Sequence, residues 1–231
     1  MDELSSPLNS ATQDGRQDFF RMVYGWMALG LLVTAAVGWF TYSDTTLFTY
    51  LINNSTIFTC LLLLQIVEVV TFVFLIDKVN AIWAKVLFIT YAATVGTTLS
   101  SIFYIFQLDS IGSIFVTTAG MFAVLAWWGA TTKKDLTSMG SIAMMGLFGL
   151  IIASVVNLFL HNSFLDYVLS WIGVLIFSCL TAYDVQKIGA YYQPGESGDQ
   201  ETKEAIHGAL KLYLDFINIF LDLLKLFGRR R

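Results

Sequence analysis

Seven apolar runs give this chain of 231 residues its strongest constraint. Each run is long enough, or nearly so, to cross the hydrocarbon core of a membrane as an α-helix, which takes about 20 residues. The predicted spans are Met22–Tyr42, Ile57–Ile76, Ala81–Phe106, Ile111–Ala130, Ser141–Leu160, Phe164–Ile188 and His207–Phe227. The sequence therefore predicts an all-α integral membrane protein with seven transmembrane helices.

The remaining residues leave little room for anything else. Only 13% of the chain is charged, against roughly 25% in a soluble domain, so a soluble catalytic domain of ordinary size is excluded. We expect a polar cytoplasmic tail over residues 1–20, one membrane domain over 21–228 and a basic tail over 229–231. The first 18 positions hold four acidic residues and no apolar core, so they do not form a secretory signal.

The basic residues predict how the chain is threaded. Nine of them lie in or beside the N-terminal tail and the second, fourth and sixth connections, and none lies in the first, third or fifth. These nine are Arg16, Arg21, Lys78, Lys85, Lys133, Lys134, Lys187, Lys203 and Lys211. The positive-inside rule then places the N-terminus in the cytoplasm. Lys225 and Arg229–Arg231 depart from the pattern, and they leave open a re-entrant last segment that returns the C-terminus to the cytoplasm.

Small residues predict where helices pack closely. Ala92, Gly96 and Ser100 recur every four residues in the third span, and Gly149, Ala153 and Asn157 form a similar stripe in the fifth. Such stripes allow helix backbones to approach each other in a bilayer. Hydrolase patterns of Ser, Cys and His, a phosphate-binding glycine loop and metal-ligand spacings are absent from the sequence.

Four carboxylates lie inside predicted spans, at Glu68, Asp184, Asp215 and Asp222. An acid in hydrocarbon is costly and usually faces a cavity or a partner. With the predicted threading, all but Asp222 fall in the cytoplasmic half of the membrane. Asp215, Asn218 and Asp222 recur at i, i+3 and i+7, so they form one polar stripe along the last helix.

Two explanations of these acids are open. Each acid could be neutralised on its own helix, Asp215 by Lys211 and Asp222 by Lys225. Alternatively, two carboxylates at one depth share a proton or bind a cation, because both cannot stay ionised cheaply. Oxygen ligands favour a hard ion such as Ca²⁺, but these residues fall short of a full Ca²⁺ shell. That suits weak binding and passage.

Four segments together resemble the Bax inhibitor-1 family, also called the transmembrane Bax inhibitor motif family. They are Val23–Met27, Thr132–Leu136 with Met139-Gly140, Ala182-Tyr183-Asp184 and Leu212–Asn218. The resemblance covers nearly the whole chain after the tail. The short tail and compact loops are similar to the bacterial members, which implies the inner membrane.

The resemblance implies a seven-helix fold in which the last helix is central between two three-helix layers. It also implies a pH-sensitive calcium leak whose paired aspartates match Asp184 and Asp215, while Glu68 matches the acid of the second span. Family members can carry an arginine latch at the end of that span. Here Lys78 stands nearby, and its point charge differs from the fork of an arginine.

These observations lead to a leading function and two alternatives. We expect a non-enzymatic, proton-gated calcium leak in which Asp184 and Asp215 sense pH and bind Ca²⁺ weakly, and Glu68, Asp222 and Asn218 line the route. Its partners would be the lipid bilayer, Ca²⁺ and H⁺, with no tightly bound cofactor and no nucleic acid. Some bacterial relatives imply instead a regulator of a membrane protease or another membrane protein. An intramembrane aspartic hydrolase is disfavoured, because no glycine precedes either aspartate.

Overall fold

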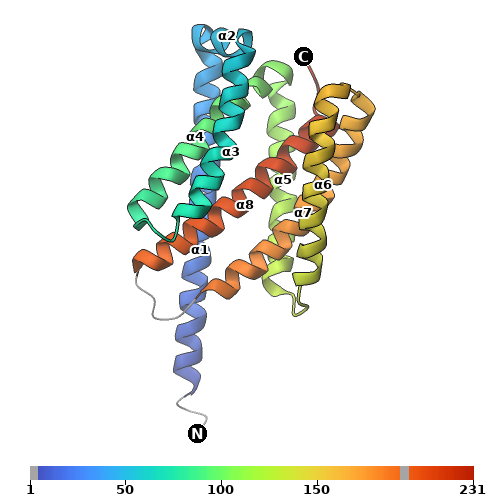
Figure 1. Ribbon diagram of the computed structural model, residues 1–231. Coiled ribbons are helices and arrows are strands. Elements are labelled where there is room, and N and C mark those ends of the chain that lie inside the picture. Colours follow the sequence, from blue (N-terminus) through green and yellow to red (C-terminus); the bar gives the residue numbers. More distant parts are fainter. Residues whose placement is uncertain (1–4, 193–197) are drawn as a thin grey trace. The chain divides into compact units, whose positions relative to one another are not determined.

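The computed structural model describes residues 5–192 and 198–231, with side chains from Asp14 onward. Helices dominate this part of the chain (Figure 1). They are α1 (Ser5–Ser43), α2 (Thr45–Asn53), α3 (Ser55–Leu75), α4 (Ala81–Ile105), α5 (Leu108–Thr131), α6 (Thr137–Leu160), α7 (Ser163–Tyr191) and α8 (Gly198–Phe227). Within the described residues there is no strand, and Phe106 and Arg230 form an isolated β-bridge. The all-α prediction is confirmed.

Six of these helices, α1 and α3 to α7, are long and apolar enough to cross a membrane. They correspond to the first six predicted spans, so the chain is a multi-pass membrane protein. In α3 and α6 only 6% of the most apolar window is buried inside the protein, and such surfaces suit contact with lipid. α1 begins at Ser5 and so extends into the segment predicted as a tail.

The sequence did not predict α2, which occupies most of the first connection. Asp44 is its N-cap residue, and its Oδ1 accepts hydrogen bonds from the backbone N–H groups of Thr46 and Leu47 at 3.0 and 3.1 Å. Such a cap satisfies donors that a helix start leaves free. The sequence signal for the start of this helix is an aspartate followed by two threonines and an apolar residue.

The chain folds as two compact units. Unit 1 contains Met1–Tyr104 and Gly189–Leu210, and unit 2 contains Ile105–Ile188 and Lys211–Arg231. Inside unit 1, Ala92 and Gly96 of the predicted packing stripe pack against α1. The hydroxyl of Thr34 donates to the carbonyl of Ala92 at 2.9 Å, and a Cβ added to Gly96 would lie 2.6 Å from the carbonyl oxygen of Thr34.

Replacing Gly96 should therefore destabilise unit 1. Gly96→Ala places a methyl group against the α1 backbone, and overpacking of this kind costs about 1–3 kcal/mol. We expect a lower midpoint of thermal unfolding in detergent. Gly25→Ala in α1 is the control, because no atom lies within 4 Å of the added Cβ. Equal midpoints for the two variants would show that the contact between α1 and α4 is not tight.

The prediction for the second stripe was wrong for Gly149. Gly149 is exposed, and an added Cβ would meet nothing within 4 Å. α6 instead contacts α7 through Gly140, whose Cβ would lie 2.5 Å from the Tyr183 ring, and through Gly146, which faces Ile176. The contact surface of α6 is therefore rotated relative to the predicted stripe. Periodic small residues could not distinguish these two faces.

The end of the chain is fixed to the connection between α4 and α5 inside unit 2. Gln107 N donates to the carbonyl of Arg229, and Arg231 N donates to the carbonyl of Ile105, both at 2.9 Å. At the start of α7, Asp166 lies 3.8 Å from Lys225 of α8. Figure 1 shows the C-terminus at the upper end of unit 2, together with the connection between α4 and α5 and the connection between α6 and α7. The connection between α5 and α6 lies at the opposite end.

Candidate functional site

Close packing positions the segment of α7 that carries Asp184. A Cβ on Gly129 of α5 would lie 2.3 Å from the carbonyl oxygen of Ala182, so only a glycine lets α5 approach this closely. On α6, Gly140 makes similar room for the ring of Tyr183. Close approach at small residues is a main way in which helices associate in membranes. The Ala182-Tyr183-Asp184 motif is therefore held by two neighbouring helices.

Gln186 fixes the same helix to the connection between α5 and α6. Its Oε1 accepts a hydrogen bond from the backbone N–H of Leu136 at 2.9 Å, and its Nε2 donates to the carbonyl of Lys134 at 2.8 Å. Hydrogen bonds from the hydroxyl and backbone N–H of Thr137 hold the pKa of Asp135 below its usual value. The Thr132–Leu136 motif thus serves to order this connection.

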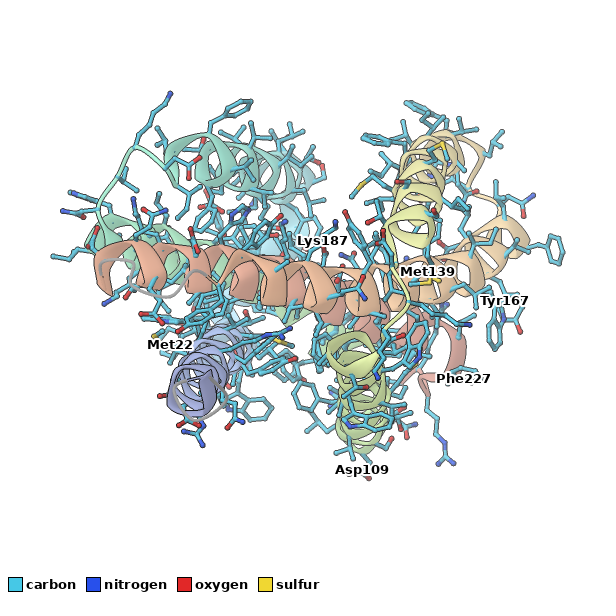
Figure 2. All side chains as sticks on the ribbon, turned by 90° about the horizontal axis from the view of Figure 1, so that it is seen from below. Met22, Asp109, Met139, Tyr167, Lys187 and Phe227 are labelled. Carbon is cyan, nitrogen blue, oxygen red and sulfur yellow. The ribbon has the colours of Figure 1, made fainter. Side chains whose placement is uncertain are left out.

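Asp184 of α7 and Asp215 of α8 both lie in unit 2, and their carboxylates interact electrostatically. Asp215 is only 4% exposed, and its Oδ2 has no hydrogen-bond partner among the described residues. The two carboxylates interact electrostatically with each other and with the ammonium group of Lys211, which lies one turn before Asp215. In Figure 2, the labelled Lys187 marks the end of α7 that follows Asp184. We call Asp184, Asp215 and Lys211 the charge cluster.

This arrangement combines the two explanations that the sequence left open. The ammonium group of Lys211 interacts electrostatically with Asp215 and also with Asp184, so one ammonium group serves two carboxylates. A buried acceptor without a partner is costly and is best satisfied by a proton, a cation or water. The cluster therefore has the chemistry to exchange a proton or a cation. Two carboxylates alone do not complete a Ca²⁺ shell.

Glu68 lies in unit 1, on α3. Its Oε2 is 2.6 Å from the hydroxyl of Thr94 on α4, which donates to it. Gln65, one turn earlier, donates to the carbonyl of Thr94 and to the hydroxyl of Thr98. Lys78, the residue considered as a latch, is exposed in the connection between α3 and α4. Glu68 is thus half-buried and hydrogen-bonded within its own unit.

Asn218 and Asp222 line a cavity of about 640 Å³ in unit 2. Lys225 lies 3.8 Å from Asp166 and also attracts the carboxylate of Asp222, which agrees with the interpretation that Lys225 offsets the charge of Asp222. Tyr167 and Phe227, which both contact Trp171, mark this end of α7 and α8 in Figure 2. No group of three or more His, Cys, Asp or Glu side chains that could hold a metal ion occurs in the described part of the chain.

Two residues of the site were missed in the sequence. Gly129 and Gln186 carry no charge and form no recognisable spacing. Their roles depend on which faces of α5, α7 and α8 meet, and that is not readable from one helix at a time. Lys211 was visible, but only as a partner of Asp215 on its own helix.

The chain is similar over most of its length to a family of known proteins. Residues 16–231 match the model of a family described as "Inhibitor of apoptosis-promoting Bax1". The chain is 42% identical over 219 residues to the inner membrane protein YbhL of Escherichia coli K12, with 94% of each chain covered. A protein of Borreliella burgdorferi is also 42% identical, again with 94% of each chain covered. YrjE of Lactococcus lactis is 39% identical, with 93% of this chain and 92% of YrjE covered.

Proposed function

Because this chain belongs to the Bax inhibitor-1 family, we propose that it is a pH-sensitive calcium leak whose gate is the charge cluster. The observation that carries the proposal is the buried, unpartnered Oδ2 of Asp215 beside a second carboxylate and one ammonium group. Protonation changes the charge of such a cluster, and a charge change at a helix contact can bias two conformations. No part of this mechanism requires catalysis.

The path of the ion follows the sequence prediction. Ca²⁺ is the transported substrate, and the carboxylates of Asp184 and Asp215 bind it weakly and transiently. Weak binding suits passage, since an ion must leave the site as readily as it enters. Glu68, Asn218 and Asp222 are the further polar groups along the proposed route, and Lys211 takes the basic role first considered for Lys78.

The same proposal includes how the chain lies in the membrane. α8 carries too many charged residues to resemble the other six spans, but its contacts in unit 2 support a full crossing as the seventh span. The resemblance supports the proposal that this helix lies between two three-helix layers. The name of YbhL supports an inner-membrane location, and the basic residues support a cytoplasmic N-terminus.

Reporter fusions test this threading. A reporter after Lys134 should be cytoplasmic, whereas reporters near Asp109 and after Arg231 should both be external, because the C-terminus lies at the connection between α4 and α5. Paired fusions to an enzyme active only in the periplasm and a fluorophore active only in the cytoplasm give the readout. A cytoplasmic signal after Arg231 together with an external one near Asp109 would restore the re-entrant model.

Reconstitution separates a leak from a regulator of another membrane protein. The purified chain, placed in liposomes without any other protein, should release trapped Ca²⁺. A regulator would produce no flux alone and would co-purify with a stoichiometric membrane partner after mild solubilisation. Absence of flux together with a co-purifying partner, obtained with protein that keeps its helical content, would show that the chain is a regulator and not a leak.

A further inference from the structure

The cavity at the Asp222 end of unit 2 has two different walls. Its lining residues come from α6, the connection after it, α7 and α8, all inside unit 2. Leu150, Ile151, Val155 and Leu158 of α6 make one wall aliphatic, while the facing wall carries Ser170, Asn218 and Asp222. Its volume of about 640 Å³ lies within the range of small-molecule pockets. Seven of its lining residues are apolar and ten are polar, so the cavity offers both kinds of contact to a ligand.

The polar wall is built around the carboxylate of Asp222. A Cβ on Gly173 would lie 2.1 Å from Asp222 Oδ2, so the carboxylate occupies space that only a glycine leaves open. Ser170, one turn earlier on α7, is 1% exposed, and its hydroxyl interacts with the carboxylate of Asp222. Asn218, one turn before Asp222, donates a hydrogen bond from its Nδ2 to the carbonyl of Leu214 at 2.8 Å. Its Oδ1 therefore remains an acceptor.

These oxygen atoms favour one class of ligand. Asp222, Ser170 and Asn218 together offer three acceptors, and an ammonium group of the –NH₃⁺ type has three N–H donors. A divalent metal fits less well, because the second carboxylate of the cavity, on Asp166, already faces Lys225 at 3.8 Å. The aliphatic wall of α6 would receive the carbon chain of the ligand. We propose that this cavity binds a primary ammonium group carried on an aliphatic body.

Two sources could supply this chemistry. One is a soluble alkylamine, and the other is the ethanolamine headgroup of a membrane phospholipid, whose acyl chains would lie beside the exposed apolar side chains of α6. The proposal does not depend on the calcium leak. Binding can be measured on purified protein without any flux, so either idea can fail alone.

Calorimetric titration with n-butylammonium tests the site in detergent at pH 8. Butyltrimethylammonium is the matched probe, because it carries the same charge and chain but has no N–H donor. We expect n-butylammonium to bind at least about tenfold more tightly than the matched probe. Asp222→Asn should weaken n-butylammonium binding by about tenfold or more, and Ser170→Ala by about three- to tenfold.

Asp166→Asn is the control for general electrostatic attraction, since it removes a carboxylate of the same cavity that is already paired. It should change the affinity by less than about threefold. The proposal is overturned if both probes bind alike, if no heat is measured, or if Asp222→Asn and Ser170→Ala both fold normally and keep wild-type affinity. Equal weakening by Asp166→Asn and Asp222→Asn also overturns it, because attraction would then be unspecific.

Native mass spectrometry distinguishes the two sources. The protein is equilibrated with phosphatidylethanolamine and phosphatidylcholine of identical acyl chains, which differ in their N–H donors. Selective retention of phosphatidylethanolamine that is lost in Asp222→Asn assigns the site to the lipid headgroup. Binding of n-butylammonium without selective lipid retention assigns it to a soluble amine.

Discussion

Lys211→Met should destabilise the protein by at least about 1 kcal/mol at pH 8, because it removes the ammonium group that interacts with the carboxylates of Asp184 and Asp215. The loss should shrink at acidic pH, where protonation removes the charges of Asp184 and Asp215. It should also shrink by at least about 1 kcal/mol in the Asp215→Asn background, since that variant no longer carries the unpaired charge. Thermal unfolding in detergent across pH gives the measurement.

Lys225→Met is the matched control on the same helix. Lys225 and Asp166 are each about half exposed and lie 3.8 Å apart, so their salt bridge should contribute less than about 1 kcal/mol. If both lysine variants lose the same stability, or if Asp215→Asn does not reduce the effect of Lys211→Met, then Lys211 does not compensate the aspartate pair. Asp184, Asp215 and Lys211 would then not form a cluster that stabilises the fold.

The second large effect concerns Asp184→Asn and Asp215→Asn. Each substitution removes a charge but keeps the size and most hydrogen-bonding capacity of the side chain. If the two aspartates share a proton, each single variant should flatten the pH dependence of calcium flux, and the double variant should add little. The measurement is the rate of Ca²⁺ release from liposomes at several pH values for the wild type, the two single variants and the double variant.

Glu68→Gln is the comparison variant, because Glu68 is hydrogen-bonded to Thr94 in unit 1 and is not part of the charge cluster. It should change the rate without removing the pH dependence. Additive effects of the two aspartate variants within about 0.5 kcal/mol, with an intact pH response in each, would show that they are independent. Glu68 and Asp222 would then be the next candidates for the sensor.

Much of this picture could be predicted from one sequence, because lipid restricts what a chain can do. Long apolar runs must be helical in a bilayer, so six spans were accessible, and carboxylates inside them must find partners. The pairing of Asp184 with Asp215 came from the family resemblance. The stripe containing Gly96 was also predicted correctly, since α1 offered it a matching surface.

The failures have a common physical origin. α6 carries small residues on more than one face, and only the position of α7 decides that Gly140 and Gly146 make the contact while Gly149 does not. The shared role of Lys211 likewise requires Asp184 of another helix to lie beside it. α2 was missed because a short helix leaves no long apolar run. Each failure concerns a contact between segments, which periodicity along one segment cannot supply.

The central claim is that this chain alone conducts Ca²⁺ under the control of pH. Its most direct test is a pH step applied to liposomes that contain the purified protein and a trapped calcium dye. We expect Ca²⁺ flux above that of protein-free liposomes, with a rate that changes severalfold between about pH 5 and 8, where shared carboxylates titrate. No flux of Ca²⁺, Na⁺ or H⁺ at any pH in this range, from correctly folded protein, would contradict the account.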